Sequence, residues 1–501
     1  MGASTEFFQS QVGGTSVMNY SYTDFPVKLL VRDIYYFFVY SWALPWIVRP
    51  LTPWSSGPLD ELYPSWENMA CILVHLVLVM LQLVFVFSLP VAVILPPWVS
   101  AAGLSALLAV NWVLCKALNS RETTFHSDEQ YAKPRPEHAH EQWVFLNGVA
   151  VGEHWMKSNL NRLAITFGRP VLGIHNKTSG IIFDIVECLV QRNFTYATND
   201  VRICFKLLRD VLYDPSKSKV IFILHSQGGI EGSLVLDWLL QEMPQDLLAK
   251  LEVYTFGNAA NHFNNPHRHV DSQRLTMHDP RSAATTFYSE ASFSSTGPAD
   301  AENGTAPAIR PTTPAPAVTD STQPPSPARI VSAAKDRAIG HIEHYAHSTD
   351  FVALWGVLHF ATHRMGSPQL PRFLGRLFNR TSSRGGHQFN QHYLDDMFPL
   401  ARDPATGAFI GADENNEFME ETVEVGGDGE EASRAREDLS ISCLGTDIDG
   451  AGDGVPPPVQ VDGMAGRRRE KAAGGVKVKE LSRLWSYRNG QSPGDVIGTR
   501  A

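Results

Sequence analysis

The chain has 501 residues, of which 44% are hydrophobic and only 19% charged. It can bury a full-sized core but is poor in charge for a wholly soluble protein, so part of it is expected in lipid. A formal net charge of -10 leaves no basic footprint, which argues against nucleic acid as a partner. The five cysteines lack metal-ligand or disulfide spacing, which indicates a reducing compartment.

The N-terminal segment, residues 1–66, contains an aromatic stretch, "IYYFFVYSWALPWIV", from Ile34 to Val48. It is too short to span a bilayer comfortably and is interrupted by Pro45, which favours an interfacial or re-entrant helix. If it does span, the two termini lie on opposite faces of the membrane. No cleavable signal peptide is expected, because polar, acidic and aromatic residues rather than a short basic region precede the first apolar run.

Residues 67–119 carry two long apolar runs that predict a transmembrane helical hairpin. Residues 69–95 contain no charged side chain, and a second run follows at 98–118 after the break at Pro96 and Pro97. At a rise of about 1.5 Å per residue, each run can cross a hydrocarbon core of about 30 Å. Polar side chains within the runs are expected to hydrogen-bond between the helices: His75, Gln82 and Asn111.

The charges around the hairpin predict its topology. The connection between the helices has no Lys or Arg, whereas basic residues lie on both flanks: Lys28, Arg32, Arg49, Lys116, Arg121, Lys133 and Arg135. Both termini are therefore expected in the cytosol, in a multi-pass integral membrane protein in contact with membrane lipid. A hairpin buried in a protein core is the alternative. Four N-x-[ST] sequons argue against a cytosolic domain: Asn176, Asn193, Asn303 and Asn379.

From about residue 142, short β-branched and aromatic runs alternate with helical segments. The runs at 143–148, 169–176, 219–225, 251–258 and 340–347 predict strands, and apolar spacing predicts helices over 180–192 and 199–213. This alternation is typical of an α/β fold with a doubly wound, mostly parallel sheet, which we expect over residues 140–400. A Pro/Ala/Thr/Ser-rich insertion at 290–334 and the tail at 401–501 are predicted to be disordered.

The strand predicted over 219–225 stops at Ser226, and a helical pattern follows. A serine nucleophile on a sharp strand-to-helix turn has the signature G-x-S-x-G, because its backbone is strained and its neighbours must be small. Here the five residues are Leu224-His225-Ser226-Gln227-Gly228, and two more glycines follow at 229 and 232. Leu224 departs from the signature, so it must find room beside the helix or the turn must open.

A strand that ends in "HSQGG" before an amphipathic helix resembles the α/β-hydrolase superfamily, in its lipase-like and esterase-like branches. The chain is also similar to membrane-anchored fungal hydrolase-like proteins of unknown substrate. The resemblance covers residues 142–400 without the insertion and reaches neither the hairpin nor the tail. It implies an α/β-hydrolase fold and a triad in the order Ser, acid, His, so both partners of Ser226 should lie downstream.

The resemblance implies Asp350 as the acid of this triad, because it follows the late strand predicted at 340–347. Its role would be to orient the imidazole and stabilise the imidazolium as it forms. The alternative is that Asp350 only caps the helix that begins there. Asp271 and Asp279, in a more irregular stretch, are rival acids.

The resemblance implies His387 as the base, on a glycine-containing loop between a short strand and a helix. His392 is the alternative base. Five residues along a helix correspond to a rotation of about 140°, so both rings cannot face Ser226 equally well. His225, next to the candidate nucleophile, is expected to pack within the turn, because adjacent residues at a strand end point apart.

Acyl transfer also requires donors aimed at the developing oxyanion. The resemblance places one at the backbone N–H of Gln227 and the second near Gly148 or Val149, after the first predicted strand of the domain. The histidines of this chain complete no metal motif with cysteines or carboxylates, and no metal or cofactor is expected.

Two functions follow from the sequence. The first is a membrane-anchored serine hydrolase, lipase-like or esterase-like, that cleaves an ester or acyl bond of a lipid or similar amphiphile through Ser226, His387 and Asp350. The second is a hydrolase-fold protein without catalysis that acts as a membrane tether or interaction platform. Leu224 is the main support for the second.

Overall fold

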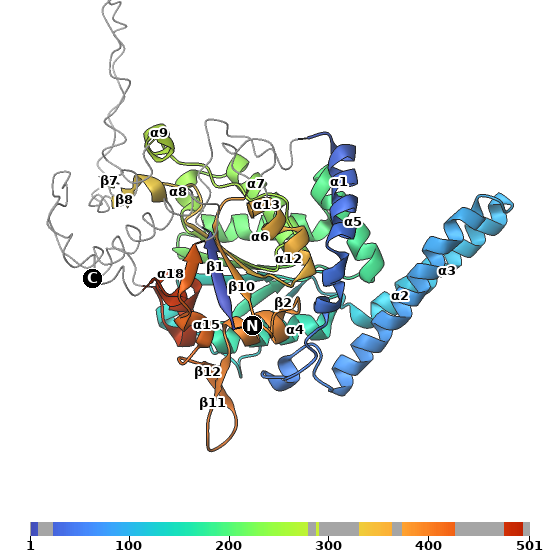
Figure 1. Cartoon of the computed structure of the whole chain (residues 1–501), viewed down its shortest axis with the longest axis horizontal. Helices are drawn as coiled ribbons and strands as arrows, with labels where there is room; N and C mark the ends of the chain where they lie inside the picture. Colours follow the sequence, from blue (N-terminus) through green and yellow to red (C-terminus); the bar gives the residue numbers. More distant parts are fainter. Residues whose placement is uncertain are drawn as a thin grey trace, which may run out of the picture.

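The computed structural model of the protein describes residues 2–8, 24–278, 287–289, 330–362, 373–425 and 475–493. Its centre is a nine-stranded sheet in the order β13-β1-β10-β9-β6-β5-β3-β4-β2 (Figure 1). Its strands, in chain order, are β1 (Ser4–Phe8), β2 (Thr124–His126), β3 (Glu141–Leu146), β4 (Val171–Ile174), β5 (Lys219–His225), β6 (Leu251–Phe256), β9 (His341–His347), β10 (Arg376–Thr381) and β13 (Val423–Val425).

The middle of this sheet is parallel, from β4 through β3, β5, β6 and β9 to β10. Antiparallel pairing occurs only towards the edges of the sheet, where β2 pairs with β4 and β1 with β10. The five strands and two helices predicted from the sequence are all present, with small shifts at their ends. The expectation of an α/β fold with a mostly parallel sheet is confirmed.

Two cores cover the two faces of the sheet, because successive side chains of a strand point to opposite sides. On β5, Val220, Phe222 and Leu224 belong to one core, and Ile221 and Ile223 belong to the other. The first core is closed by α5 (Ile181–Phe194), α6 (Asn199–Tyr213), α7 (Gln227–Glu242), α12 (Phe351–Trp355) and α13 (Val357–Thr362). The second is closed by α4 (Glu153–Phe167), a π-helix η5 (Phe389–Leu394), α14 (Asp395–Met397), α15 (Glu417–Glu420), α18 (Val478–Leu481) and η7 (Leu484–Gly490).

The two apolar runs near the N-terminus form α2 (Trp66–Ala92) and α3 (Pro97–Leu118), an antiparallel hairpin that projects from the α/β body (Figure 1). Both helices are long and apolar enough to cross a membrane. Only 17% of the most apolar stretch of α2 and 11% of that of α3 is buried within the protein, which argues against the alternative of a core hairpin.

The aromatic stretch at 34–48 lies against the α/β body instead of standing apart from it. It spans the end of α1 (Pro26–Val39) and a 3-10 helix, η1 (Ser41–Ile47). The Phe37 ring packs edge-on against Phe351, and the Asp33 carboxylate pairs with the buried Arg192 guanidinium at 2.7 Å. In this structure the stretch therefore does not form a spanning helix, while an interfacial position stays a prediction.

The prediction of a disordered tail at 401–501 is wrong for residues 401–425 and 475–493. After the hairpin of β11 (Leu400–Arg402) and β12 (Phe409–Ala412), α15 and β13 join the body, and the C-terminal elements α18 and η7 pack on the second core. Trp485 and Tyr487 are buried, and Arg483 pairs with Glu252 of β6 at 2.7 Å. Composition alone misses these contacts, because a few apolar residues in a polar tail become structured only against distant strands. Residues 426–474 and 494–501 lie outside the described part of the chain.

The boundary of the α/β domain at 140–400 is also too narrow, because β1, β2 and β13 belong to the same sheet. Most of the insertion predicted at 290–334 lies outside the described residues. Its last residues instead form β8 (Ile330–Ser332), which pairs with β7 (Phe287–Ser289), and the start of η4 (Ala333–Lys335). The remaining short helices are η2 (Gly57–Leu59), η3 (Pro136–His138), α8 (Gln245–Leu248) and α9 (Val270–His278).

Candidate active site

The structure brings Ser226, His387 and Asp350 into one hydrogen-bonded chain. His387 Nε2 lies 3.0 Å from Ser226 Oγ, and His387 Nδ1 lies 3.0 Å from Asp350 Oδ2. All three side chains are buried. They follow β5, β9 and β10, whose parallel carboxyl ends meet at one edge of the sheet, where α/β folds place their ligands. The arrangement is the one that allows a base to take the proton of a serine hydroxyl while a carboxylate orients it.

The backbone of Ser226 is strained, as a sharp turn from β5 into α7 requires. Its φ of 57° and ψ of -121° lie in a region that a non-glycine residue rarely occupies. The turn is held by neighbouring loops, since the Ser226 N–H donates to Phe256 O at 3.1 Å and its carbonyl accepts from Gly229 and Ala259. A side chain at Gly228 would clash with the carbonyls of Leu146 and Asn147, so the small residue is needed there.

Leu224, the residue that departs from the signature, finds room beside α7. Its side chain is fully buried and lies against Gly232, where an added Cβ would clash with the leucine methyl groups. The turn therefore stays closed, because a glycine one turn into the helix provides the space that the signature normally provides at the strand end. Leu224 thus gives no geometric reason for a distorted site.

We expect Gly232→Ala to lower the free energy of unfolding by about 1–3 kcal/mol, because the methyl group overpacks the contact with Leu224. Urea unfolding of the detergent-solubilised protein measures this change. Gly103→Ala, at a helical glycine with open space around it, is the matched control and should not destabilise. An equal loss in both variants, or no loss at Gly232, contradicts the packing argument.

Asp350 both caps a helix and binds the imidazole, so the two alternative roles coincide. Its Oδ1 accepts from the Val352 N–H at 2.8 Å at the start of α12, and its Oδ2 faces His387. Tyr393 Oη donates to the same Oδ2 at 2.6 Å. Burial alone would raise the pKa of Asp350, but His387 and these hydrogen bonds hold that pKa below its ordinary value. The carboxylate is therefore ionised at neutral pH.

The other candidate residues lie outside this chain of contacts. His392 Nε2 binds Pro50 O at 2.9 Å and its Nδ1 accepts from the Gln388 N–H, so the alternative base does not face Ser226. Asp271 lies on α9 beside Arg274, and Asp279 lies outside the described residues. His225 stacks on His387 and binds its carbonyl oxygen at 2.9 Å, in agreement with a packing role. Burial, followed by the neighbouring His387, lowers the pKa of His225 to about 3, so it stays neutral.

Two of the residues predicted to provide oxyanion donors, Gly148 and Gln227, lie beside Ser226. Gly148 is packed so closely against the Ser226 side chain that an added Cβ would clash with it. Among the described residues, the backbone N–H groups of Gly148 and Val149 have no hydrogen-bond acceptor, and Gln227 begins α7, where the first helical N–H groups are unpaired. These donors are free to bind a developing negative charge.

Two asparagines, to which the sequence analysis gave no role at the site, hold these donor loops in place. The Asn147 amide binds both the N–H and the carbonyl of Asn176 at 2.9 Å, and also Gly148 O. Asn176 Nδ2 in turn donates to Gln227 Oε1 at 2.8 Å. Asn147 directly follows β3 and Asn176 lies two residues after β4, and this position at the strand ends was the available signal.

Residues 46–51, which we call the strap, lie across the histidine loop. The His387 N–H donates to Trp46 O at 3.2 Å, Gln388 Nε2 donates to Ile47 O at 2.8 Å, and Gln391 Nε2 donates to Pro50 O at 2.9 Å. Backbone carbonyls of the strap therefore position the loop that carries the base. The sequence offered no signal for this, since any residue type provides a carbonyl oxygen.

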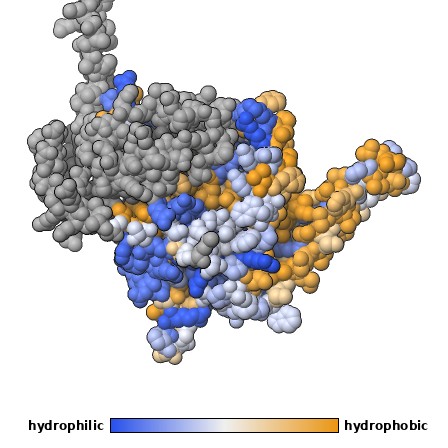
Figure 2. All heavy atoms as spheres, in the orientation of Figure 1, coloured by the Kyte–Doolittle hydropathy of each residue, from blue (hydrophilic) through white to orange (hydrophobic). Residues whose placement is uncertain are grey.

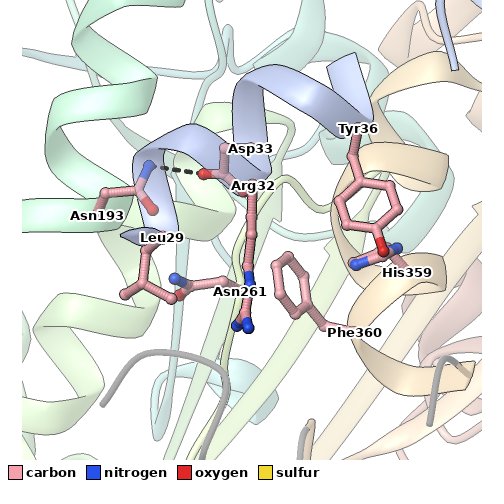
Figure 3. A pocket seen from close by; sticks show the side chains of 8 residues that line it. All are labelled: Leu29, Arg32, Asp33, Tyr36, Asn193, Asn261, His359 and Phe360. Carbon is pink, nitrogen blue, oxygen red and sulfur yellow. Dashed lines mark hydrogen bonds between the residues drawn. The ribbon is translucent and has the colours of Figure 1, made fainter. Parts of the chain in front are cut away.

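A small pocket lies between α1, the end of α5 and α13, apart from the triad (Figure 3). Its lining includes Asp33, whose Oδ2 accepts from Asn193 Nδ2 at 2.6 Å, and contains none of the triad residues. Asp33 also pairs with Arg192, whose guanidinium stacks on the Trp355 ring at 3.6 Å and donates to Ala259 O at 2.7 Å. Because Ala259 also binds the Ser226 carbonyl, this buried cluster supports the turn from behind.

No protein-family model matches this chain, and no curated protein matches it either.

Proposed function

We propose that this protein is a membrane-anchored serine hydrolase with an α/β-hydrolase fold, which cleaves an ester or acyl bond of a lipid or similar amphiphile. The observation that carries the proposal is the continuous contact from Asp350 through His387 to Ser226, with Ser226 on a strained turn at the end of a central parallel strand. The α2–α3 hairpin supports attachment to a membrane. Attachment to a membrane would hold the site near lipid, which favours an amphiphilic substrate.

In the proposed mechanism, Ser226 Oγ attacks the carbonyl carbon while His387 Nε2 accepts its proton. Asp350 keeps Nδ1 protonated and stabilises the imidazolium. The backbone N–H groups of Gln227 and of Gly148 or Val149 stabilise the oxyanion. His387 then returns the proton to the leaving group. Water, activated by the same imidazole, releases the acyl group from Ser226.

A fluorophosphonate probe tests this proposal, because it phosphonylates only an activated serine. We expect the full-length protein in detergent to be labelled and Ser226→Ala to remain unlabelled. Ser233→Ala, which alters a buried serine elsewhere on α7, is the matched control and should be labelled like the wild type. Absence of labelling in folded wild-type protein would favour the catalytically inactive tether instead.

Tyr393→Phe tests a positioning role for the tyrosine that binds Asp350. We expect kcat for a p-nitrophenyl ester to fall about tenfold, because one hydrogen bond to a charged group is lost. With one donor fewer, the Asp350 carboxylate attracts the imidazole proton more strongly, so the acid limb of the kcat/KM profile should move to higher pH. A fall in activity without that movement would indicate a purely structural role.

A further inference from the structure

The α2–α3 hairpin is tied to the α/β body by a cluster of polar contacts, which we call the clamp. Gln82 Nε2 donates to Asn111 Oδ1 at 3.0 Å and to Ser179 O at 2.7 Å, and Asn111 Nδ2 donates to Ser179 O at 3.0 Å. The Ile182 N–H donates to Gln82 Oε1 at 3.0 Å. Gly180 permits this approach, because any side chain there would clash with Gln82. Gln82 and Asn111 thus form the hydrogen bond expected between the two helices, and both also bind the α/β body.

The first half of α2, on the N-terminal side of the clamp, packs against α4. Asn68 Oδ1 accepts from Trp155 Nε1 at 2.9 Å, and the His75 ring stacks on Trp155 with centroids 5.4 Å apart. A spanning helix needs about 20 residues in hydrocarbon, which would carry the clamp and the His75–Trp155 contact into the membrane. The exposed Glu153–Lys157 ion pair, which flanks Trp155 on α4, would then be brought close to the hydrocarbon, where charges are costly to desolvate.

Beyond the clamp, the hairpin is apolar, and Phe85 makes a last contact with the body, edge-on to the Phe183 ring of α5 with centroids 5.4 Å apart. Residues 83–92 and 97–110 contain no charged side chain. At about 1.5 Å per residue they reach roughly 15–20 Å, which is about half to two thirds of a hydrocarbon core. Side chains at and near the tip are highly exposed: Phe87 73%, Val93 85%, Ile94 85% and Trp98 76%. Figure 2 shows the projecting arm as mostly hydrophobic, with some less hydrophobic residues towards its tip.

The neighbouring helices add a second apolar surface, which we call the aromatic face. α5 contacts both α1 and α2, and the outer side chains of α1, η1 and α5 are exposed and largely aromatic or branched. They are Val31, Tyr35, Phe38, Trp42, Val186 and Phe194, together with Tyr196 just after α5. Tyrosine and tryptophan favour the headgroup level of a membrane, where one end of the ring is dry and the other wet.

We infer that the hairpin enters a single leaflet of a phospholipid membrane up to the clamp, with the aromatic face resting at the headgroups, and does not cross the bilayer. The clamp sets the depth, because Gln82 and Asn111 are satisfied by the body and not by lipid. Its Ser179 lies three residues after Asn176, which binds Gln227 beside the candidate nucleophile. The membrane surface therefore lies next to the candidate active site.

Cysteine accessibility in phosphatidylcholine proteoliposomes tests this inference without any readout of catalysis, so it can fail or succeed independently of the proposed hydrolase. The full-length variant Ile94→Cys carries the probe at the exposed tip, and Lys206→Cys on α6 is the matched control on the body. A membrane-impermeant maleimide is either added outside or trapped inside the vesicles. Peptide mass spectrometry shows which cysteine carries the label, so the native cysteines need not be replaced.

We expect Ile94→Cys to stay unlabelled from either side, whatever the orientation of the protein, and to become fully labelled when detergent dissolves the vesicles. Lys206→Cys should be labelled from the side on which the body lies. Labelling of Ile94→Cys from the side opposite to Lys206→Cys would show a spanning hairpin and overturn the inference. Labelling of both positions from the same side would show a hairpin outside the membrane and overturn it equally.

Discussion

Replacing His387 with Gln is expected to lower kcat for an ester substrate by roughly 10⁵- to 10⁶-fold, the largest effect of any single change outside Ser226 itself. Its Nε2 is the group positioned to take the Ser226 proton, at 3.0 Å. Without a base, the hydroxyl remains a weak nucleophile at neutral pH. Initial rates with a p-nitrophenyl ester measure the loss.

His392→Gln is the matched control for this change. His392 is buried, is a histidine on the same segment, and binds the strap at Pro50 O instead of Ser226. We expect kcat to change by less than about tenfold, provided circular dichroism shows an unchanged fold. Comparable losses in both variants would mean that the imidazole of His387 has no special role. A larger loss at His392 would identify it as the base.

Asp350→Asn is expected to lower kcat by about 10⁴-fold at pH 7, with little change in KM. Asparagine can still cap α12, so the helix start is preserved. It has no negative charge to stabilise the imidazolium, however, and its amide can turn a donor towards His387 Nδ1. The imidazole would then place its proton on Nε2, which could no longer accept from Ser226.

Asp336→Asn provides a control with the same chemistry elsewhere in the fold. Asp336 is buried and lies 3.0 Å from His269 Nδ1, so it forms an aspartate–histidine pair outside the candidate site. We expect no more than about a twofold change in kcat. A loss of kcat in Asp336→Asn as large as that in Asp350→Asn would contradict a specific role for Asp350.

The pKa of Asp350 lies below its ordinary value, so wild-type activity should not fall through protonation of this carboxyl between pH 5 and 8.

Much of the local structure could be predicted because its determinants lie close together in the chain. The run Lys219–His225 is apolar on both faces, which a buried parallel strand requires, and the glycines after Ser226 allow the helix to begin at once. The helical hairpin was equally evident, because two long apolar runs have few other stable structures. Ser226 could be selected from the turn signature after its strand, and Asp350 and His387 through the resemblance to the α/β-hydrolase superfamily.

The contacts that complete the site join segments far apart in the sequence, and these could not be predicted. Only the folded chain decides that His387 and not His392 faces Ser226, that one Asp350 oxygen caps a helix while the other binds a ring, and that Tyr393 supports it. The space for Leu224 likewise comes from Gly232 through packing across a strand and a helix.

The sequence by itself determined where strands, helices and apolar runs form, since backbone strain, hydrophobic spacing and helix length act within a few residues. The tertiary structure alone decided that the strap positions the histidine loop, that residues 475–493 complete a core, and that the clamp limits the free length of the hairpin. The physical reason is common to all three. Their contacts depend on backbone carbonyls or on a few side chains that meet only after the sheet has brought distant segments together, so no local pattern encodes them.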